Sequence, residues 1–248
     1  MVELGRVDVI AETSKLASAM AMPREGHLDA VFHVLGCLSN RHNSRMVFDP
    51  SCPEINERDF LSSDWKDFYE DSEEPVPSDA PIPLGKDVDV RNYVDSDHAS
   101  DKRSRKSRTG CFFYINSAPV AWKSAKQKTV ETSAFGSEFV AMKQAMEHNR
   151  GLRYKLRMMG APVNGPTCFY GDNMSVINNM TRPESTLKKK SNSICHHAVR
   201  EAVAMQEMMA AHVGTKENPA DLATKTSHSK ATREHLVDKL LYNVYDAA

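Results

Sequence analysis

The sequence has 248 residues, of which 40% are hydrophobic and 26% charged, and its formal net charge is -1. This composition is typical of a globular chain and excludes disordered, collagen-like and membrane-embedded proteins. The charge is uneven, because residues 1–90 carry 8 Lys and Arg against 18 Asp and Glu, whereas residues 91–248 carry 24 against 15. A basic C-terminal part favours a polyanionic partner, although basic surfaces also serve solubility alone.

The five cysteines share no CxxC spacing, and their number is odd. This pattern indicates neither a disulfide framework nor a zinc site, and it is typical of a reducing compartment. The sequence has no apolar run of 18 residues, and its N-terminus lacks the basic and hydrophobic regions of a signal peptide. We therefore expect no membrane segment and no export route.

The first elements in chain order are two predicted helices. Residues 7–22 lack strand alternation and are predicted to be helical, and Pro23 is predicted to start a second helix in its first turn. The apolar residues of this second helix recur at helical spacing, at Leu28, Val31, Leu35 and Leu38. We expect an antiparallel pair without catalytic groups, and we assign residues 1–48 to it.

The next segment, residues 49–87, is rich in proline and in acidic residues. Proline opposes both helix and central strand, so this segment is predicted to be a linker or a strap over a surface. Residues 51–90 carry 3 Lys and Arg against 12 Asp and Glu, and therefore supply most of the negative charge of the N-terminal part.

Residues 88–248 are predicted to form the compact domain. Strands are expected from about residue 88 to Asp95 and at residues 111–115, 120–123, 167–171 and 210–214. Helices are expected after the N-cap Ser133, in a second run ending at Gly160, and at residues 174–180, 192–209 and 229–242, with a short one near residue 221. This order predicts an α/β domain whose mixed five-stranded sheet begins with an antiparallel hairpin.

Four acidic residues lie at the ends of these predicted elements. Asp95 ends the first strand, Glu138 lies in the first turns of a helix, Asp172 follows the fourth strand, and Asp221 opens the short helix. Loops beyond strand ends converge in open α/β sheets, so the acids are candidates for one shared site. Clustered carboxylates repel one another unless a cation is present, and they are the ligands Mg²⁺ prefers. Taken singly, each acid has an ordinary alternative, such as a helix N-cap for Asp172 and a first-turn acid for Asp221.

The four acids together, with their neighbours, resemble a known family. The stretch from YVDSDHASDK to GSEFVAM, followed by FYGDNMSVI and TKENPADLATK, resembles the ribonuclease H region of Ty1/copia-type LTR retrotransposon Pol polyproteins. Residues 6–38 resemble the end of the reverse transcriptase portion of the same polyproteins. The resemblance covers nearly the whole chain, and it implies a ribonuclease H-like α/β fold for residues 88–248 and a helical remnant of the reverse transcriptase for residues 1–48.

The resemblance also implies roles for the acids. Asp95 would bridge two Mg²⁺ or Mn²⁺ ions, Glu138 and Asp172 would complete one of them, and Asp221 would hold the other. Gly136 stands where the family usually has a second acid, and KKKSNSI at 188–194 replaces a basic-His-apolar-Asp stretch. These departures bear on substrate contacts more than on the four acids.

The candidate nucleic-acid contacts lie close to Asp95. The basic candidates are Lys102, Arg103, Arg105, Lys106 and Arg108 in the following loop, and Lys123, Lys126 and Lys128 near the third strand. Such clusters neutralise phosphates without reading sequence. Ser133 and Asn173 are candidate donors to 2′-hydroxyls. His212 is a candidate for product release or proton transfer, although a structural role at a strand end is favoured.

The resemblance implies metal-dependent cleavage of the RNA strand of an RNA/DNA hybrid during reverse transcription, with the rest of the polyprotein as partner and a cytoplasmic virus-like particle as location. The alternative is an inactive hybrid-binding remnant of a truncated element. Tyr93-Val94-Asp95-Ser96-Asp97 lacks the adjacent aspartates of a polymerase box, so DNA synthesis is not expected. An integrase-like nuclease is disfavoured because the last acid is Asp221 and not Glu.

Overall fold

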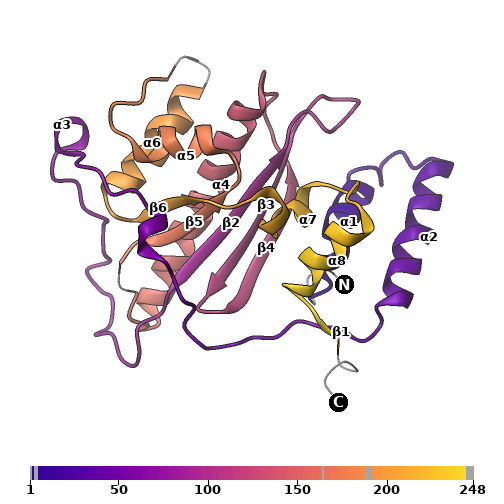
Figure 1. Cartoon of the computed structure of the whole chain (residues 1–248), viewed down its shortest axis with the longest axis horizontal. Helices are drawn as coiled ribbons and strands as arrows, with labels where there is room; N and C mark the ends of the chain where they lie inside the picture. Colours follow the sequence, from indigo (N-terminus) through magenta and orange to yellow (C-terminus); the bar gives the residue numbers. More distant parts are fainter. Residues whose placement is uncertain (1, 3–4, 164, 188–191, 244–248) are drawn as a thin grey trace.

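Five strands form one mixed sheet in the computed structural model, which describes residues 2, 5–163, 165–187 and 192–243 (Figure 1). The strands are β2 (Val90–Asp97), β3 (Arg108–Ile115), β4 (Ala118–Lys126), β5 (Thr167–Gly171) and β6 (Met208–His212). Their order across the sheet is β4-β3-β2-β5-β6. β2, β3 and β4 pair antiparallel, while β5 pairs parallel with β2 and with β6. The predicted α/β class, with a mixed five-stranded sheet and flanking helices, is confirmed.

Helices cover both faces of this sheet. One core lies under α4 (Ala134–Met158), α5 (Met174–Thr181) and α6 (Ser193–Ala204), and it includes Phe139, Met142 and Phe169. The other core lies under α1 (Ile10–Ala17), α7 (Asp221–Thr224) and α8 (Lys230–Asp238), and it includes Ile10, Phe112 and Leu236. Buried apolar area on both faces stabilises the sheet and fixes where its strands end.

The helix between β4 and β5 differs from the prediction of two separate helical runs. α4 begins after the predicted N-cap Ser133, whose hydroxyl accepts a hydrogen bond from the backbone N–H of Gly136, and it continues for 25 residues. Gly151 is exposed and does not interrupt this helix. The helix ends near Gly160, which has a φ of 73°.

Two other predicted boundaries are wrong. The helix expected over residues 192–209 ends at Ala204, and Gln206 then takes a positive φ of 56°. Residues 208–212 form β6 instead, because parallel pairing with β5 satisfies their backbone groups. The last helix, α8, ends at Asp238, and β7 (Tyr242–Asn243) pairs antiparallel with β1 (Ser44–Arg45).

The first N-terminal helix is shorter than the predicted helix over residues 7–22. A 3-10 turn, η2 (Val7–Val9), leads into α1, and the helix ends at Ala17, before the exposed Met20 and Met22. Val7 and Ile10 belong to the same buried core as Phe112, so this part of the chain packs on the sheet.

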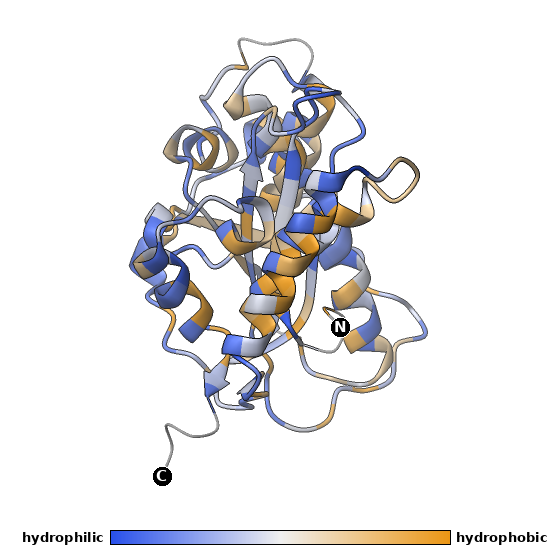
Figure 2. Ribbon diagram, turned by 90° about the vertical axis from the view of Figure 1, so that its right-hand side faces the viewer, coloured by the Kyte–Doolittle hydropathy of each residue, from blue (hydrophilic) through white to orange (hydrophobic). Residues whose placement is uncertain are grey.

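The second N-terminal helix, α2 (Glu25–Asn40), begins after Arg24 and has no buried residue. Leu28, Phe32 and Leu35 on this helix are all more than half exposed. Figure 2 looks onto the side of the molecule that carries α2 and colours the ribbon by hydropathy. α2 therefore contributes little to the core.

The acidic segment crosses the surface as a strap, as predicted, with only the short elements η3 (Glu57–Asp59) and α3 (Lys66–Tyr69). Trp65 enters the core beneath α4 and α6, with 5% of its surface exposed. Glu74 accepts hydrogen bonds from Arg153 and Arg157 of α4 at 2.6 to 2.8 Å. Apolar and ionic contacts thus tie the segment to α4.

Among the described residues, no helix is both long enough and apolar enough to cross a lipid bilayer.

Candidate metal centre

Asp95 and Asp172 come together because their strands are parallel neighbours. The last residue pair between β2 and β5 is Tyr93 with Tyr170, and each acid lies two residues beyond that pair. β2 continues to Asp97, two residues further than predicted, because it pairs with β3 as far as Arg108. Asp95 is therefore held inside a strand, while Asp172 follows the end of one.

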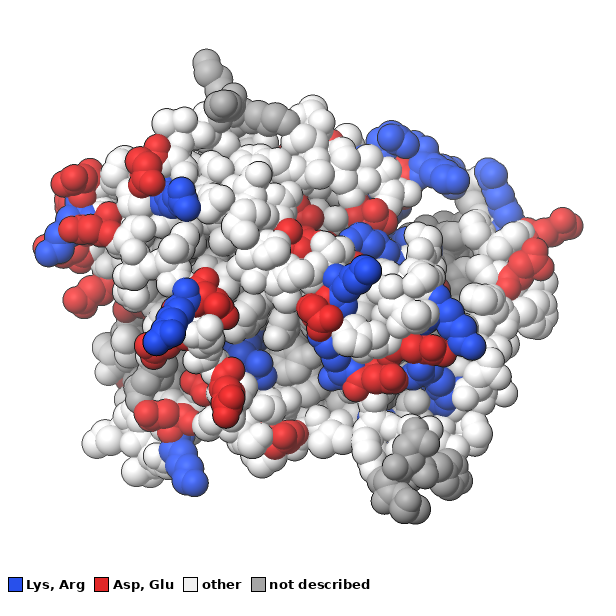
Figure 3. Space-filling view, in the orientation of Figure 1, with Lys and Arg blue, Asp and Glu red and all other residues white. Residues whose placement is uncertain are grey.

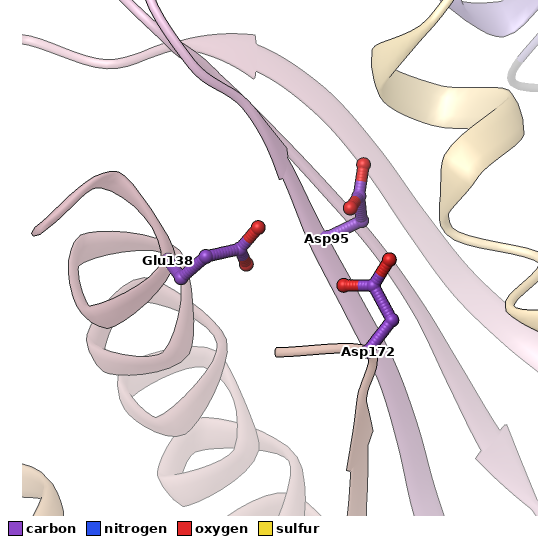
Figure 4. Close-up of side chains that lie close together, drawn as sticks. All are labelled: Asp95, Glu138 and Asp172. Carbon is purple, nitrogen blue, oxygen red and sulfur yellow. The ribbon is translucent and has the colours of Figure 1, made fainter. Parts of the chain in front are cut away.

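Glu138 reaches the same point from the other side. The cap at Ser133 starts α4 over the carboxyl ends of β2 and β5, which places Glu138 in the second turn. Candidate ligand oxygens of Asp95, Glu138 and Asp172 all lie within 4.8 Å of one another. Figure 4 shows the three side chains, from β2, α4 and the end of β5, pointing toward one another.

Burial makes this cluster electrostatically unfavourable as three anions. Asp95 is 1% exposed, and its burial raises its pKa to about 7, with the charges of Asp221 and Asp172 acting in the same direction. Burial also raises the pKa of Glu138 well above its usual value, and Asp95 and Asp172 add to that rise. A proton or a cation is needed to offset this repulsion.

Asp221 lies beside Asp95, and its charge helps to raise the pKa of that residue. Lys225 joins the two, since its Nζ lies 2.6 Å from Asp221 Oδ1 and 3.5 Å from Asp95 Oδ1. Burial alone would lower the pKa of Lys225, but the charges of Asp95 and Asp221 and the hydrogen bond to Asp221 raise it overall. The four predicted acids are thus brought to one place, with an ammonium group between two of them.

The short helix α7 is positioned by contacts that begin in β2 and β3. Asn218 is fully buried, and its amide donates to the carbonyl of Val94 at 3.0 Å while its oxygen accepts from the N–H of Ala220. Gly110, paired with Asp95, allows the helix to approach, because a Cβ there would lie 2.7 Å from the carbonyl oxygen of Ala220. These contacts set Asp221 against Asp95.

Hydroxyl groups complete the surroundings of the acids. Thr224 donates a hydrogen bond to Asp95 Oδ2. Ser96 donates to Ser137 at 2.9 Å, and hydrogen bonding to Ser96 favours the charged form of Glu138. The carboxylates are therefore held in place by groups on β2, α4 and α7.

This donor set fits a hard divalent cation. Three converging carboxylates, two of them buried, provide oxygen ligands and negative charge in a site that already disfavours three free anions. The three carboxylates come from separate elements that are held in place by packing. Their arrangement does not depend on Lys225.

His212 lies at the edge of this site. Its Nε2 is 3.1 Å from the carbonyl oxygen of Asp172, and its side chain is exposed at the end of β6. The predicted strand-end location is confirmed, and the contact also places the ring next to an acid of the cluster.

The predicted basic loop divides into exposed and buried parts. Lys102, Arg103 and Arg105 are exposed, and Figure 3 shows basic side chains gathered over the loop between β2 and β3. Lys106 is half-buried. Arg108 is only 4% exposed and donates to the hydroxyls of Ser14 and Ser124. The structure therefore does not present Arg108 to a ligand, because its side chain holds α1 against β4.

The other basic candidates also differ from one another. Lys123 is half-buried beside His148, and Lys126 forms an ion pair with Asp101, whereas Lys128 is exposed. The ion pair ties β4 to the loop.

Ser133 and Asn173 are both helix N-caps. The hydroxyl of Ser133 accepts from Gly136, and the amide oxygen of Asn173 accepts from the N–H groups of Ser175 and Val176 at 3.1 and 3.3 Å. Asn173 directly follows Asp172, and Ser133 precedes Glu138 by five residues. Contact of either side chain with a 2′-hydroxyl stays a prediction. Of KKKSNSI, residues 188–191 lie outside the described residues.

Lys225, Thr224 and Asn218 were missed by the sequence analysis. Lys225 follows Asp221 by four residues in NPADLATK, and this spacing places an ammonium on the same helical face as a carboxylate. That signal was available for Lys225. The contacts of Thr224 and Asn218 to β2 join residues more than 120 positions apart, and no local pattern indicates them.

Comparison with protein-family models finds no match. A retrovirus-related Pol polyprotein from a Nicotiana tabacum transposon is 29% identical over 141 residues, which cover 57% of this chain and 10% of that protein. Another, from an Arabidopsis thaliana transposon, is 24% identical over 220 residues, covering 89% of this chain and 13% of that protein. The chain therefore spans roughly a tenth of the length of these relatives. The resemblance to retrotransposon Pol polyproteins is confirmed.

Solved structures similar to this chain include the N-terminal ribonuclease H domain of a Mycobacterium tuberculosis protein. It is 11% identical, with a TM-score of 0.42, and the match covers 61% of this chain and 97% of that domain.

Proposed function

We propose that this protein is a retrotransposon ribonuclease H that hydrolyses the RNA strand of RNA/DNA hybrids with the help of two divalent metal ions. The observation that carries the proposal is the convergence of Asp95, Glu138 and Asp172 within 4.8 Å, with Asp221 beside them, in a chain whose relatives are retrotransposon Pol polyproteins. The resemblance of the four acid-containing motifs to copia-type ribonucleases H supports the hybrid as substrate.

The acids have distinct roles in this proposal. Asp95, Glu138 and Asp172 would hold one ion, and Asp95 with Asp221 would hold the other. Bound Mg²⁺ or Mn²⁺ supplies an activated water and stabilises the charge that develops on the phosphodiester. The helix cap at Ser133 and the contacts of Asn218 keep the carboxylates converged before substrate arrives, so little reorganisation is needed.

The exposed cations of the β2–β3 loop would hold the hybrid. Lys102, Arg103 and Arg105 project from the loop that starts just after β2, and they neutralise phosphates without selecting a base sequence. His212, whose ring contacts the carbonyl of Asp172, is a candidate for proton transfer or product release at the same edge. In this proposal the remainder of a Pol polyprotein supplies the hybrid by reverse transcription.

A cleavage assay on three duplexes tests this function. We expect an RNA strand paired with DNA to be cut when Mg²⁺ or Mn²⁺ is added, whereas duplex DNA and duplex RNA remain intact. Chelation should stop the reaction. Equal cleavage of the hybrid by wild type and by Asp95→Asn would contradict the proposal.

The assay also separates the alternative of an inactive hybrid-binding protein. Such a protein would retard the hybrid on a gel, with affinity that falls steeply as salt rises, and would release no fragments. The buried, mutually repelling acids favour the nuclease, since a binding surface for phosphates gains nothing from carboxylates at its centre.

A further inference from the structure

Lys225 is a cation already placed among the acids. Its Nζ lies 2.6 Å from Asp221 Oδ1 and 3.5 Å from Asp95 Oδ1, between the two carboxylates that the proposed function assigns to one of the metal ions. Asp95 is 1% exposed and Asp221 is 3% exposed, so both carboxylates meet this ammonium where little water is available. The ammonium therefore offsets part of the negative charge of these two carboxylates, which a divalent ion would also offset.

The position of Lys225 follows from the fold. α7 has only four residues, and Lys225 is its C-cap, whose N–H donates to the carbonyl of Asp221. The Lys225 side chain consequently points back toward Asp221, one helical turn earlier. Because α7 approaches the sheet closely at Gly110, Lys225 and Asp221 both lie near Asp95. About a third of the Lys225 side chain is exposed, so its four-carbon stem can rotate away from the acids without crossing the core.

The geometry points to Lys225 as an internal cation that competes with a divalent ion for the place between Asp95 and Asp221. The inference rests on the proposed function, which assigns that place to a metal ion. Without nucleic acid, the ammonium holds Asp95 and Asp221 together, and a divalent ion binds the Asp95, Glu138 and Asp172 side of the cluster. The second ion binds after the ammonium has moved away, and a backbone phosphate of the hybrid is a suitable new partner for it.

Two features distinguish Lys225 from an ordinary surface ion pair. It contacts two carboxylates from different elements, β2 and α7, whereas Lys143 pairs with Glu147 within one helix. One of its partners, Asp95, is also within 4.8 Å of the other two acids of the cluster. Removing the charge at residue 225 therefore changes the electrostatic potential at the proposed metal ligands directly.

The test measures metal binding in the absence of nucleic acid. Mn²⁺ is titrated into the whole folded chain, and the free ion is followed by electron paramagnetic resonance. We expect wild type to bind one ion in a range where Lys225→Met binds two, with an affinity for the second ion higher by about tenfold, because a competing positive charge has been removed. Lys225→Gln repeats the measurement with a polar side chain, and circular dichroism checks that both variants fold.

Three further variants make the result specific. Lys225→Arg keeps the charge and should bind one ion, as wild type does. Adding Asp221→Asn to Lys225→Met should return the number to one, because it removes a ligand of the newly opened place. Lys143→Met removes an equal charge from a lysine that is about as exposed as Lys225 but contacts none of the four acids, and it should leave binding unchanged.

Two bound ions in wild type, or one in both Lys225→Met and Lys225→Gln, would overturn the inference and leave the proposed nuclease untouched. A failure of the proposed function has a different signature, because the hybrid would then remain uncut at every Mn²⁺ concentration, whatever the number of bound ions.

Discussion

Two groups of charged side chains, at opposite ends of α4, show how differently this fold treats a carboxylate. Near the C-terminal end, burial opposes the charge of Glu74, but two guanidinium groups outweigh it and lower its pKa to about 2. Near the N-terminal end, Asp95 has one partly exposed lysine and three acidic neighbours, and burial raises its pKa to about 7. A carboxylate that is paired with protein cations ties segments of the chain together. A cluster with more carboxylates than protein cations is suited to bind a metal cation.

The largest effect is expected on cleavage, when the charge of Asp95 is removed. Asp95→Asn keeps the shape of the side chain and removes the central ligand, so hybrid cleavage should fall by about 10²- to 10³-fold. In metal-free buffer at pH 7 the same variant should be at least as stable as wild type in urea, since one repelling charge has gone. Asp97→Asn, on the same strand, is the matched control and should retain activity. A clear loss of stability in Asp95→Asn would mean that the cluster is structural.

At the other end of α4, Glu74→Gln should lower the free energy of unfolding by about 2–4 kcal/mol, because the buried Arg153 loses its counter-charge. The exposed neighbour Glu73 provides the control, and Glu73→Gln should change stability little. Urea unfolding measures both. Cleavage by folded Glu74→Gln should match wild type, and a large loss of activity would show that the two acid groups are coupled.

Gly110→Ala tests how closely α7 must approach the sheet. The added methyl group would meet the carbonyl oxygen of Ala220, so we expect a loss of about 1–3 kcal/mol and weaker Mn²⁺ binding as Asp221 is displaced. Gly151→Ala adds the same group at an exposed helical position with no neighbour within 4 Å, and it should stabilise α4 slightly. If both variants behave alike, the packing of α7 does not position the site.

The smallest effect is the pH dependence, which should have opposite signs in the two groups. The native pKa of Asp95 exceeds its ordinary value of 3.8, so folding takes up a proton and stability should fall as pH rises from about 4 through 7. The native pKa of Glu74 lies below 4.5, so its contribution is present above that pH and is lost as pH falls toward 2. Urea unfolding of wild type, Asp95→Asn and Glu74→Gln across this pH range measures how much each residue contributes to the change of the free energy of unfolding with pH.

Much of this arrangement was predictable from local pattern. Ser133 indicated the start of α4, alternation and apolar runs indicated the strands, and the four acids at element ends indicated a shared metal centre. The failures occurred where long-range pairing overrode the pattern, as at Met208 and Met209, which were predicted to end a helix and instead pair with β5. Arg108 was assigned to the ligand surface because of its neighbours in sequence, but tertiary packing buried it beside Ser14.

The sequence by itself determined which residue types end each strand and begin each helix, because capping, periodicity and turn preferences act over a few residues. Only the tertiary structure decided that Asp95 has Lys225 as its near cation while Glu74 has two arginines. These pairings join residues 79 to 130 positions apart, and the folded packing of β2, α4 and α7 decides which charges meet and how much water remains between them.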